Sequence, residues 1–244
     1  MARLIARNVL IMMNPILATL MLISAIAGST ATSDDFAELR AQMVAEQLEA
    51  RDITDEATLD AMGNVPRHDF IPEAHRGMAY SDQPIPIGHG QTISQPYIVA
   101  YMTQLLELEP GQRALEIGAG SGYQAAVLAE IIDEVYTIEI IEELAQFGED
   151  NLRRNGYDNV QVKHADGYYG WEEHAPFDAI IVTAASADIP SPLVDQLKDD
   201  GVMVIPVGNP MQTQQLMLVR KDGDDITTEA LMPVQFVPFE RKED

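Results

Sequence analysis

The stretch Ala114–Gln124 constrains the fold of this chain more than any other. Leu115 and Ile117 predict a short buried strand, Gly118, Gly120 and Gly122 predict a tight turn, and Tyr123–Ile132 carries apolar residues at helical spacing. A strand that runs into a glycine turn and then a helix can form a nucleotide-type pocket, because glycines let a ligand approach the backbone and the first N–H groups of the helix are free. The same glycines also fit a plain tight turn, so the neighbouring segments have to decide between the two interpretations.

The next apolar run favours the ligand pocket. The glycine spacing is Gly-x-Gly-x-Gly, which differs from the Gly-x-Gly-x-x-Gly pattern typical of dinucleotide sites. An acidic residue, Glu116, stands just before the first glycine. The run Val135–Glu139 ends in a second acid about 20 residues beyond the glycines, where a carboxylate can accept hydrogen bonds from two ribose hydroxyls.

Polar residues also follow two further predicted strands. Val160–Lys163 leads to Asp166 and Gly167, and Phe177–Val182 leads to Thr183. Open α/β sheets bind their ligands beside the carboxyl ends of the strands. The sequence therefore predicts one ligand site that collects these residues at one edge of a sheet.

This arrangement resembles the class I S-adenosylmethionine-dependent methyltransferases, and within them the protein-L-isoaspartate O-methyltransferase family. The resemblance runs from about Phe36 to the C-terminus, and the matching segments are Val65–Pro72, Pro86–Pro96, Glu116–Gln124, Ala175–Ala185 and Val204–Gly208. It implies a doubly wound, mostly parallel α/β sheet of about seven strands with an N-terminal helical extension. It also implies S-adenosyl-L-methionine as the cofactor, bound by Glu116, Gly118, Gly120, Gly122, Glu139, Asp166, Gly167 and Thr183.

The acceptor site is predicted in the segment Val65–Pro96, which is rich in proline and glycine and shows no clear periodicity. From composition alone, Thr92 and Ser94 are more often turn formers or helix caps than ligand contacts. The resemblance favours a functional role, since the family's active-site serine matches Ser94 and the motif Gly90-Gln-Thr-Ile-Ser94 is specific to that family. The implied acceptor is the carboxylate of an L-isoaspartyl, or D-aspartyl, residue in a damaged protein. A carboxylate is already ionised at neutral pH, so its methylation requires no general base.

Charge and residue types narrow the range of partners. The formal net charge is −24 in 244 residues, and such a surface repels phosphate backbones, so we expect no nucleic-acid substrate. The chain has no cysteine, and the spacing of His68, His75 and His89 matches no metal-ligand pattern, so no metal is predicted.

Residues 1–33 predict an export signal rather than part of the fold. Arg3 and Arg7 begin the segment, an apolar stretch follows, and Ala25-Ile-Ala27 fits a small-residue cleavage site. An uncleaved membrane anchor or a buried helix are the alternatives, and only the anchor would bring the protein to a membrane. The signal predicts an exported or periplasmic protein. The cofactor, however, is made inside cells, which favours a cytoplasmic protein instead.

Residues 34–244 are predicted to form a single domain, with a helical and acceptor-loop extension (34–110) before the cofactor-binding core (111–244). We expect two short helices over Asp34–Met62, with Thr54 capping the second, and a helix from Pro190 through Leu197. Two late strands are predicted over Gln215–Arg220 and Leu231–Phe239, joined by an acidic turn. The aromatic cluster Tyr168–Trp171 fits either a pocket rim or core packing.

Two other functions remain open at this point. The chain could methylate a different carboxylate or a small molecule with the same cofactor site, or it could bind the cofactor without turnover. A dehydrogenase is a weaker third alternative, since the glycine spacing opposes it.

Overall fold

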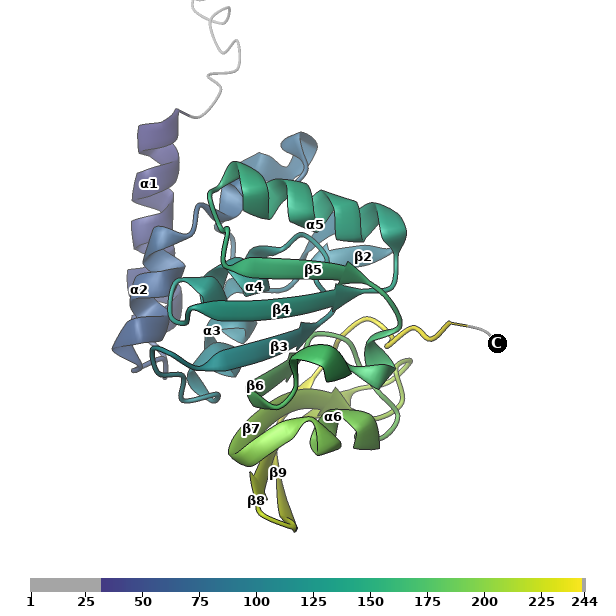
Figure 1. Cartoon of the computed structure of the whole chain (residues 1–244). Helices are drawn as coiled ribbons and strands as arrows, with labels where there is room; N and C mark the ends of the chain where they lie inside the picture. Colours follow the sequence, from purple (N-terminus) through teal and green to yellow (C-terminus); the bar gives the residue numbers. More distant parts are fainter. Residues whose placement is uncertain (1–31, 243–244) are drawn as a thin grey trace, which may run out of the picture. The chain divides into compact units, whose positions relative to one another are not determined.

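A seven-stranded sheet organises the part of the chain that the computed structural model describes, residues 32–242 (Figure 1). The predicted export segment lies almost wholly outside these residues. From one edge to the other the strands are β5 (Val160–His164), β4 (Glu134–Glu139), β3 (Arg113–Ile117), β6 (Phe177–Val182), β7 (Leu197–Val207), β8 (Gln214–Asp222) and β9 (Asp225–Val234). The strands from β5 to β7 run parallel, and β8 and β9 are antiparallel to their neighbours. The predicted doubly wound, mostly parallel sheet is confirmed.

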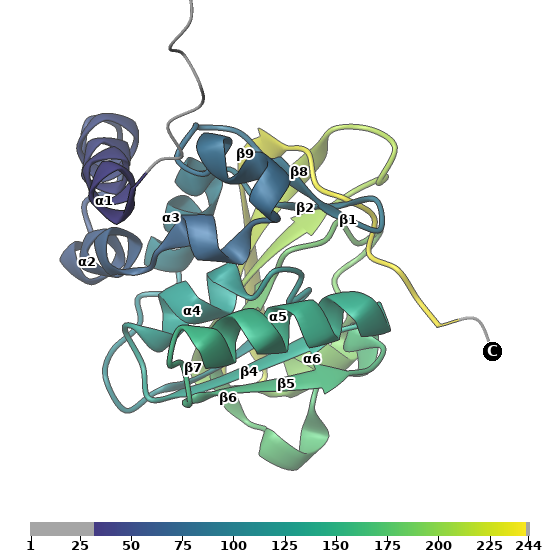
Figure 2. The same ribbon diagram turned by 90° about the horizontal axis from the view of Figure 1, so that it is seen from above.

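The central strands β3, β4 and β6 are buried on both faces of the sheet, as their apolar runs require. Side chains alternate across β3, so Ala114 packs into one hydrophobic core while Leu115 and Ile117 pack into the other. Helices α4 (Tyr123–Ala129) and α5 (Glu142–Arg154) contribute to the first core. Helix α6 (Ser191–Asp195) lies with the second, as do the short 3-10 turns η5 (Gly167–Tyr169) and η6 (Glu172–His174) (Figures 1 and 2).

The N-terminal extension is helical, as predicted. Helix α1 (Ser33–Gln42) continues into a π-helical segment, η2 (Met43–Glu49), and α2 (Glu56–Asn64) follows. The expected cap of the second helix was wrong by one residue, because the Asp55 carboxylate, not Thr54, accepts a 2.8 Å hydrogen bond from the backbone N–H of Thr58. A carboxylate is a stronger acceptor than a hydroxyl and also complements the positive end of the helix dipole.

The segment expected to lack regular structure contains several short elements. The 3-10 helices η3 (Arg67–Phe70) and η4 (Glu73–Met78) precede a small hairpin of β1 (Ile85–Gly88) and β2 (Gln91–Ile93). Helix α3 (Pro96–Gln104) follows and begins with a proline, which suits the first helical position because its missing N–H has no partner there. The two 3-10 helices and the two hairpin strands are too short to produce a periodic signal, which explains why the sequence did not reveal them.

The C-terminal end of the fold differs from the prediction in two places. Strand β7 begins at Leu197, where the preceding helix was expected to continue. Strand β9 covers Asp225–Val234 rather than Leu231–Phe239, and it forms an edge of the sheet with most of its side chains exposed. An exposed edge strand carries no alternation of apolar residues, so its first half gave no strand signal. The residues after it leave the sheet, and Val237 and Phe239 instead pair with the backbone of Ala185.

Within residues 32–242, no helix combines the length and apolar character needed to cross a bilayer.

Candidate active site

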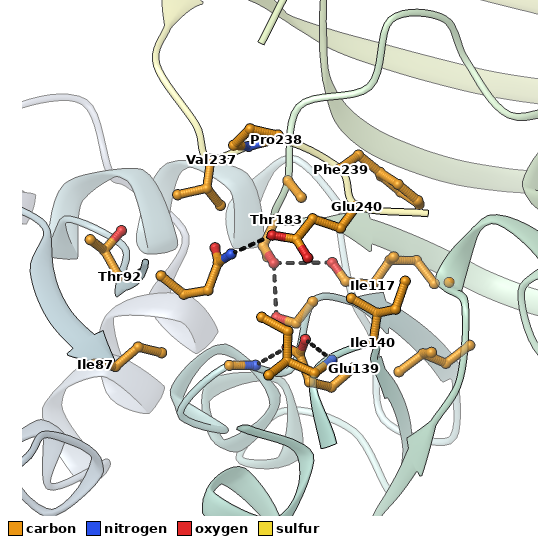
Figure 3. Close-up of a pocket in the computed structure, with 17 residues that line it drawn as sticks. Ile87, Thr92, Ile117, Glu139, Ile140, Thr183, Val237, Pro238, Phe239 and Glu240 are labelled. Atoms are coloured by element: carbon orange, nitrogen blue, oxygen red, sulfur yellow. Dashed lines mark hydrogen bonds between the residues drawn. The ribbon is translucent and has the colours of Figure 1, made fainter. Parts of the chain in front are cut away.

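A pocket lies beside the carboxyl ends of β3, β4 and β6, where the sequence predicted it (Figure 3). Six of the ten predicted site residues line it, namely Thr92, Gly118, Gly120, Glu139, Gly167 and Thr183. Apolar side chains provide much of the remaining wall, and the space including the open mouth is about 560 Å³. The pocket therefore combines a few polar groups with apolar surface, as small-molecule sites do.

Glu139, the last residue of β4, has its carboxylate fixed by the backbone. One oxygen accepts a 2.8 Å hydrogen bond from the N–H of Gly120, and the other accepts a 3.0 Å bond from the N–H of Ile141. The residue is 6% exposed. Each carboxylate oxygen has a second lone pair, so the group can still accept two hydrogen bonds from a ligand such as a ribose diol.

Gly118 holds the first turn of the glycine segment against β6. Its φ of 103° lies in a region that favours glycine, and a Cβ atom there would come within 2.3 Å of the Thr183 hydroxyl oxygen. That hydroxyl lies 2.9 Å from the carbonyl oxygen of Gly118 and 3.0 Å from that of Ile117. Thr183 thus supports the floor of the pocket through the backbone of β3.

Gly122 has a packing role and does not line the pocket. It precedes α4 with a φ of 84°, and a Cβ atom there would lie 2.9 Å from the carbonyl oxygen of Gly148 in α5. The third glycine therefore lets the glycine turn and α5 approach closely. Its assignment to cofactor binding stays a prediction.

Glu116 lines a small hollow beside the glycine turn, separate from the pocket described above. Its side chain is fully buried, one oxygen accepts a hydrogen bond from the Thr137 hydroxyl, and the other oxygen has no hydrogen-bond partner among the described residues. Burial raises the pKa of Glu116 to about 8, and the Thr137 hydrogen bond opposes this shift only in part. The group is therefore largely protonated at neutral pH and can donate a hydrogen bond.

Asp166 is engaged with the C-terminal segment rather than the pocket. Its carboxylate accepts a 2.9 Å bond from Arg241 Nε and a 3.0 Å bond from the backbone N–H of Tyr168. Burial opposes ionisation of Asp166, but these bonds and one from the backbone of Lys242 outweigh it, so its pKa lies below the usual value. Contact of Asp166 with the adenine side of the cofactor stays a prediction.

A second, larger groove adjoins the pocket and contains Ser94. Thr92, Thr183 and Val237 line both the pocket and this groove, so the two spaces meet at these three residues. The hydroxyls of Thr92 and Ser94 form no hydrogen bond within residues 32–242. Ser94 does not cap α3, whose cap position is Gln95 without a side-chain bond, so the helix-cap interpretation of Ser94 was wrong.

Several pocket residues were missed by sequence reasoning. The segment Val237–Glu240 crosses one side of the pocket, and Gln91 donates a 3.1 Å hydrogen bond to Glu240 (Figure 3). Ile140 and Ile141 extend the wall beyond Glu139. The two isoleucines directly follow the acid that ends β4 and could have been found from that position. The C-terminal segment lies more than 50 residues beyond the last predicted site residue, and its sequence offered no signal of the contact.

The aromatic cluster Tyr168–Trp171 divides between the two interpretations. Trp171 is 8% exposed and packs in the second core against Tyr136, which settles it as a core residue. Tyr168 instead lies under the guanidinium of Arg241, whose central carbon is 3.7 Å from the centre of the Tyr168 ring.

Among residues 32–242, no group of three acidic or histidine side chains is placed to hold a metal ion.

Known proteins resemble this chain over most of its length. The profile of the protein-L-isoaspartate (D-aspartate) O-methyltransferase family matches residues 38–244. The chain is 60% identical over 203 residues to the protein-L-isoaspartate O-methyltransferase of Opitutus terrae, covering 83% of this chain and 87% of that one. It is 52% identical over 234 residues to protein-L-isoaspartate O-methyltransferase 2 of Syntrophobacter fumaroxidans, covering 91% and 95% of the two chains.

Solved structures extend the similarity to the fold. One of them is a crystal structure described as a protein-L-isoaspartate O-methyltransferase from Plasmodium falciparum in complex with S-adenosyl-L-homocysteine. It superposes with a TM-score of 0.73 at 30% sequence identity, and the match covers 83% of this chain and 99% of that one. The profile match spans well over half of the chain, and the curated relatives share at least half of their aligned residues with it. The chain belongs to the protein-L-isoaspartate (D-aspartate) O-methyltransferase family.

Proposed function

We propose that this protein transfers a methyl group from S-adenosyl-L-methionine to the free carboxylate of L-isoaspartyl residues in damaged proteins, the first step of their repair. Membership in the family supports the reaction type, and the S-adenosyl-L-homocysteine in the Plasmodium falciparum structure supports the cofactor. The cofactor would occupy the pocket beside β3 and β4, and the damaged residue would occupy the groove that contains Ser94.

The pocket fits the cofactor on observations from this chain alone. Glu139 offers two fixed carboxylate oxygens to a diol, and Ile140, Ile141 and Phe239 provide apolar surface for a flat ring. Glu116 keeps one buried oxygen without a partner beside the glycine turn. When bound, the cofactor supplies a methyl group on a positively charged sulfur.

The observation that carries the choice of acceptor is the absence of a proton acceptor in the groove. Arg51 is the only ionic side chain among the described residues that line it, and neither a carboxylate nor a histidine is present. Tyr97 lines the groove too, but burial and its hydrogen bond to Asp52 raise its pKa to about 12. A groove of this composition suits an acceptor that is already an anion, because nothing in it can remove a proton from a hydroxyl or an ammonium group.

The chain's own residues would then act by orientation. The free hydroxyls of Thr92 and Ser94 can donate hydrogen bonds to a carboxylate and hold one oxygen toward the junction of groove and pocket. Thr183, at the same junction, is fixed by the carbonyl oxygens of β3. Holding two reactants in line can supply about 7–11 kcal/mol of the barrier, so orientation without acid–base chemistry is sufficient for this reaction class.

The test compares a matched pair of peptides, one with an L-isoaspartyl residue and one with a normal aspartyl residue. The protein should methylate only the first, and Ser94→Ala should lower kcat/KM at least about 10-fold, the size expected for a lost hydrogen bond to a charged group. Cofactor affinity and the free energy of unfolding should stay unchanged, because the Ser94 hydroxyl neither caps α3 nor bonds elsewhere within the described residues. Equal methylation of the two peptides would contradict the proposal, and so would full activity in a folded Ser94→Ala variant.

Location in the cell is a separate part of the proposal. We propose that the N-terminal segment directs export, on the basis of Arg3, Arg7 and the small-residue site Ala25-Ile-Ala27.

A further inference from the structure

Arg67 is a fully buried arginine without a carboxylate partner. It lies in η3, has no exposed surface, and forms no salt bridge among residues 32–242. A guanidinium group remains protonated in proteins, so burial lowers the pKa of Arg67 without removing its charge. A buried charge normally requires a counter-charge close by, which makes this position unusual.

The contacts of Arg67 connect it to the proposed acceptor site. Its Nη2 donates a 2.7 Å hydrogen bond to the carbonyl oxygen of Ser94, and its Nε donates a 2.7 Å bond to the carbonyl oxygen of Ala79. The third nitrogen, Nη1, is buried and has no hydrogen-bond partner among residues 32–242. The guanidinium carbon lies 4.7 Å from the ring centre of Tyr123, the first residue after the glycine turn.

These contacts leave the positive charge only partly balanced. Two carbonyl oxygens and the face of an aromatic ring stabilise a cation through their dipoles and quadrupole, but none of them carries a full negative charge. The Asp82 carboxylate favours the charged form of Arg67, but it is already paired with Arg51 at 3.1 Å. A neutral amide could satisfy the same two carbonyls, so hydrogen bonding alone does not explain a charged side chain here.

An anionic acceptor would provide the missing negative charge. Ser94 forms part of the groove wall, and Arg67 donates a hydrogen bond to the carbonyl group of that residue. Water is excluded around Arg67, so its field is screened less than that of a surface cation. We therefore expect the field to act on the groove beside Ser94, where the proposed function places a carboxylate.

We propose that Arg67 is a positioning residue that makes the acceptor groove selective for a carboxylate over a neutral group. It fixes the main chain of Ser94, and its unbalanced charge favours an anion beside that residue. This inference rests on the proposed function, because it assumes that the acceptor lies against Ser94.

The test uses two peptides that differ only in the charge of the acceptor. One carries L-isoaspartate, and the other carries the same residue with its free carboxylate replaced by a neutral carboxamide. Binding of each peptide is measured by calorimetry on the full chain saturated with S-adenosyl-L-homocysteine. Wild-type protein should bind the carboxylate peptide at least about 5-fold more tightly than the carboxamide, an effect that one partly screened charge can supply. Equal affinity for the two peptides overturns the inference without any variant.

Variants separate the charge from a purely structural role. Arg67→Met removes the charge and should lower the affinity ratio toward one, whereas Arg67→Lys keeps the charge and should keep most of the ratio. If Arg67 only held the structure together, its replacement would weaken the binding of both peptides equally and leave the affinity ratio unchanged. That result would contradict the inference. Arg67→Gln replaces Arg67→Met if the latter does not fold, since it retains donors for the two carbonyl oxygens.

Two other arginines serve as controls. Arg40 is a partly buried arginine that also donates to a backbone carbonyl, that of Gly63 at 2.7 Å, but it does not contact the Ser94 segment. Arg40→Met should therefore leave the affinity ratio unchanged. Arg51 lines the groove directly, and if Arg51→Met removes the preference while Arg67→Met does not, the inference is wrong.

Failure of the inference can be distinguished from failure of the proposed function. A wild-type protein that does not methylate the isoaspartyl peptide overturns both. Methylation that depends on Ser94, with an affinity ratio that is insensitive to Arg67, overturns only the role of Arg67.

Discussion

Replacement of Glu116 by glutamine should remove a large part of the pH dependence of folding stability. Glu116 is fully buried at the end of β3, and burial raises its pKa from an ordinary 4.5 to about 8. In the unfolded chain the same group ionises near 4.5. Between these two pH values the unfolded state therefore binds fewer protons than the folded state, and the free energy of unfolding falls as pH rises.

The size of the effect follows from the interval. Each pH unit between 4.5 and about 8 lowers the stability by about 1.4 kcal/mol, so the loss reaches at most about 5 kcal/mol near pH 8. The stabilisation that protonated Glu116 gives to the folded state is fully present below pH 4.5, and it is absent above about pH 8. Glutamine has the shape of the protonated acid, and its carbonyl oxygen can still accept the hydrogen bond from Thr137.

Denaturant unfolding of both proteins between pH 5 and pH 9 measures this difference. We expect Glu116→Gln to be close to wild type in stability at pH 5 and clearly more stable at pH 8. Glu143→Gln, at an exposed position near the start of α5, is the control and should follow wild type throughout. A stability difference between Glu116→Gln and wild type that does not change with pH would refute the assignment of a neutral Glu116.

Three further predictions concern other parts of the chain. Glu139→Ala should weaken cofactor binding by about 10- to 150-fold, because a hydrogen bond to a charged group is worth about 1.5–3 kcal/mol; unchanged affinity in calorimetry would exclude Glu139 from the cofactor site. Asp55→Ala should lower the free energy of unfolding by about 0.5–2 kcal/mol through loss of the α2 cap, and Thr54→Ala should have little effect in the same denaturant titration. Mass spectrometry of the native protein should show removal of Met1 to about Ala27, and an intact N-terminus in the cytoplasmic fraction would end the export proposal.

The core of the fold was predictable because its elements are long and their burial is regular. Strand β6 lies at Phe177–Val182, the residues that the sequence indicated, since a continuous apolar run that is buried on both faces is a strong local signal. The edge strand β9 and the hairpin of β1 and β2 were missed or misplaced. Their positions depend on pairing with distant segments, and they bury too few side chains to leave a periodic pattern.

The site was predictable where it depends on the ends of the central strands. Glu139 and Thr183 lie on the pocket because Glu139 ends one buried strand of the parallel sheet and Thr183 directly follows another. The contact of Val237–Glu240 with the same pocket depends on how the chain returns after β9, which no local pattern encodes. Arg67, the proposed positioning residue, was not a candidate from the sequence, because its burial without a counter-charge shows only in the packed structure.

The exposed edge strand β9 affects how copies of this protein meet. A free strand edge can pair with the edge of another molecule and begin a continuous intermolecular sheet. Here the edge carries Asp225 and Glu229, and Pro233 lacks a backbone donor near its end. Charge repulsion between two such edges disfavours their pairing at neutral pH, and protonation of the acids weakens that protection. Storage and crystallisation at acidic pH should therefore promote β-type association through this edge, in a protein whose isoelectric point is about 4.3.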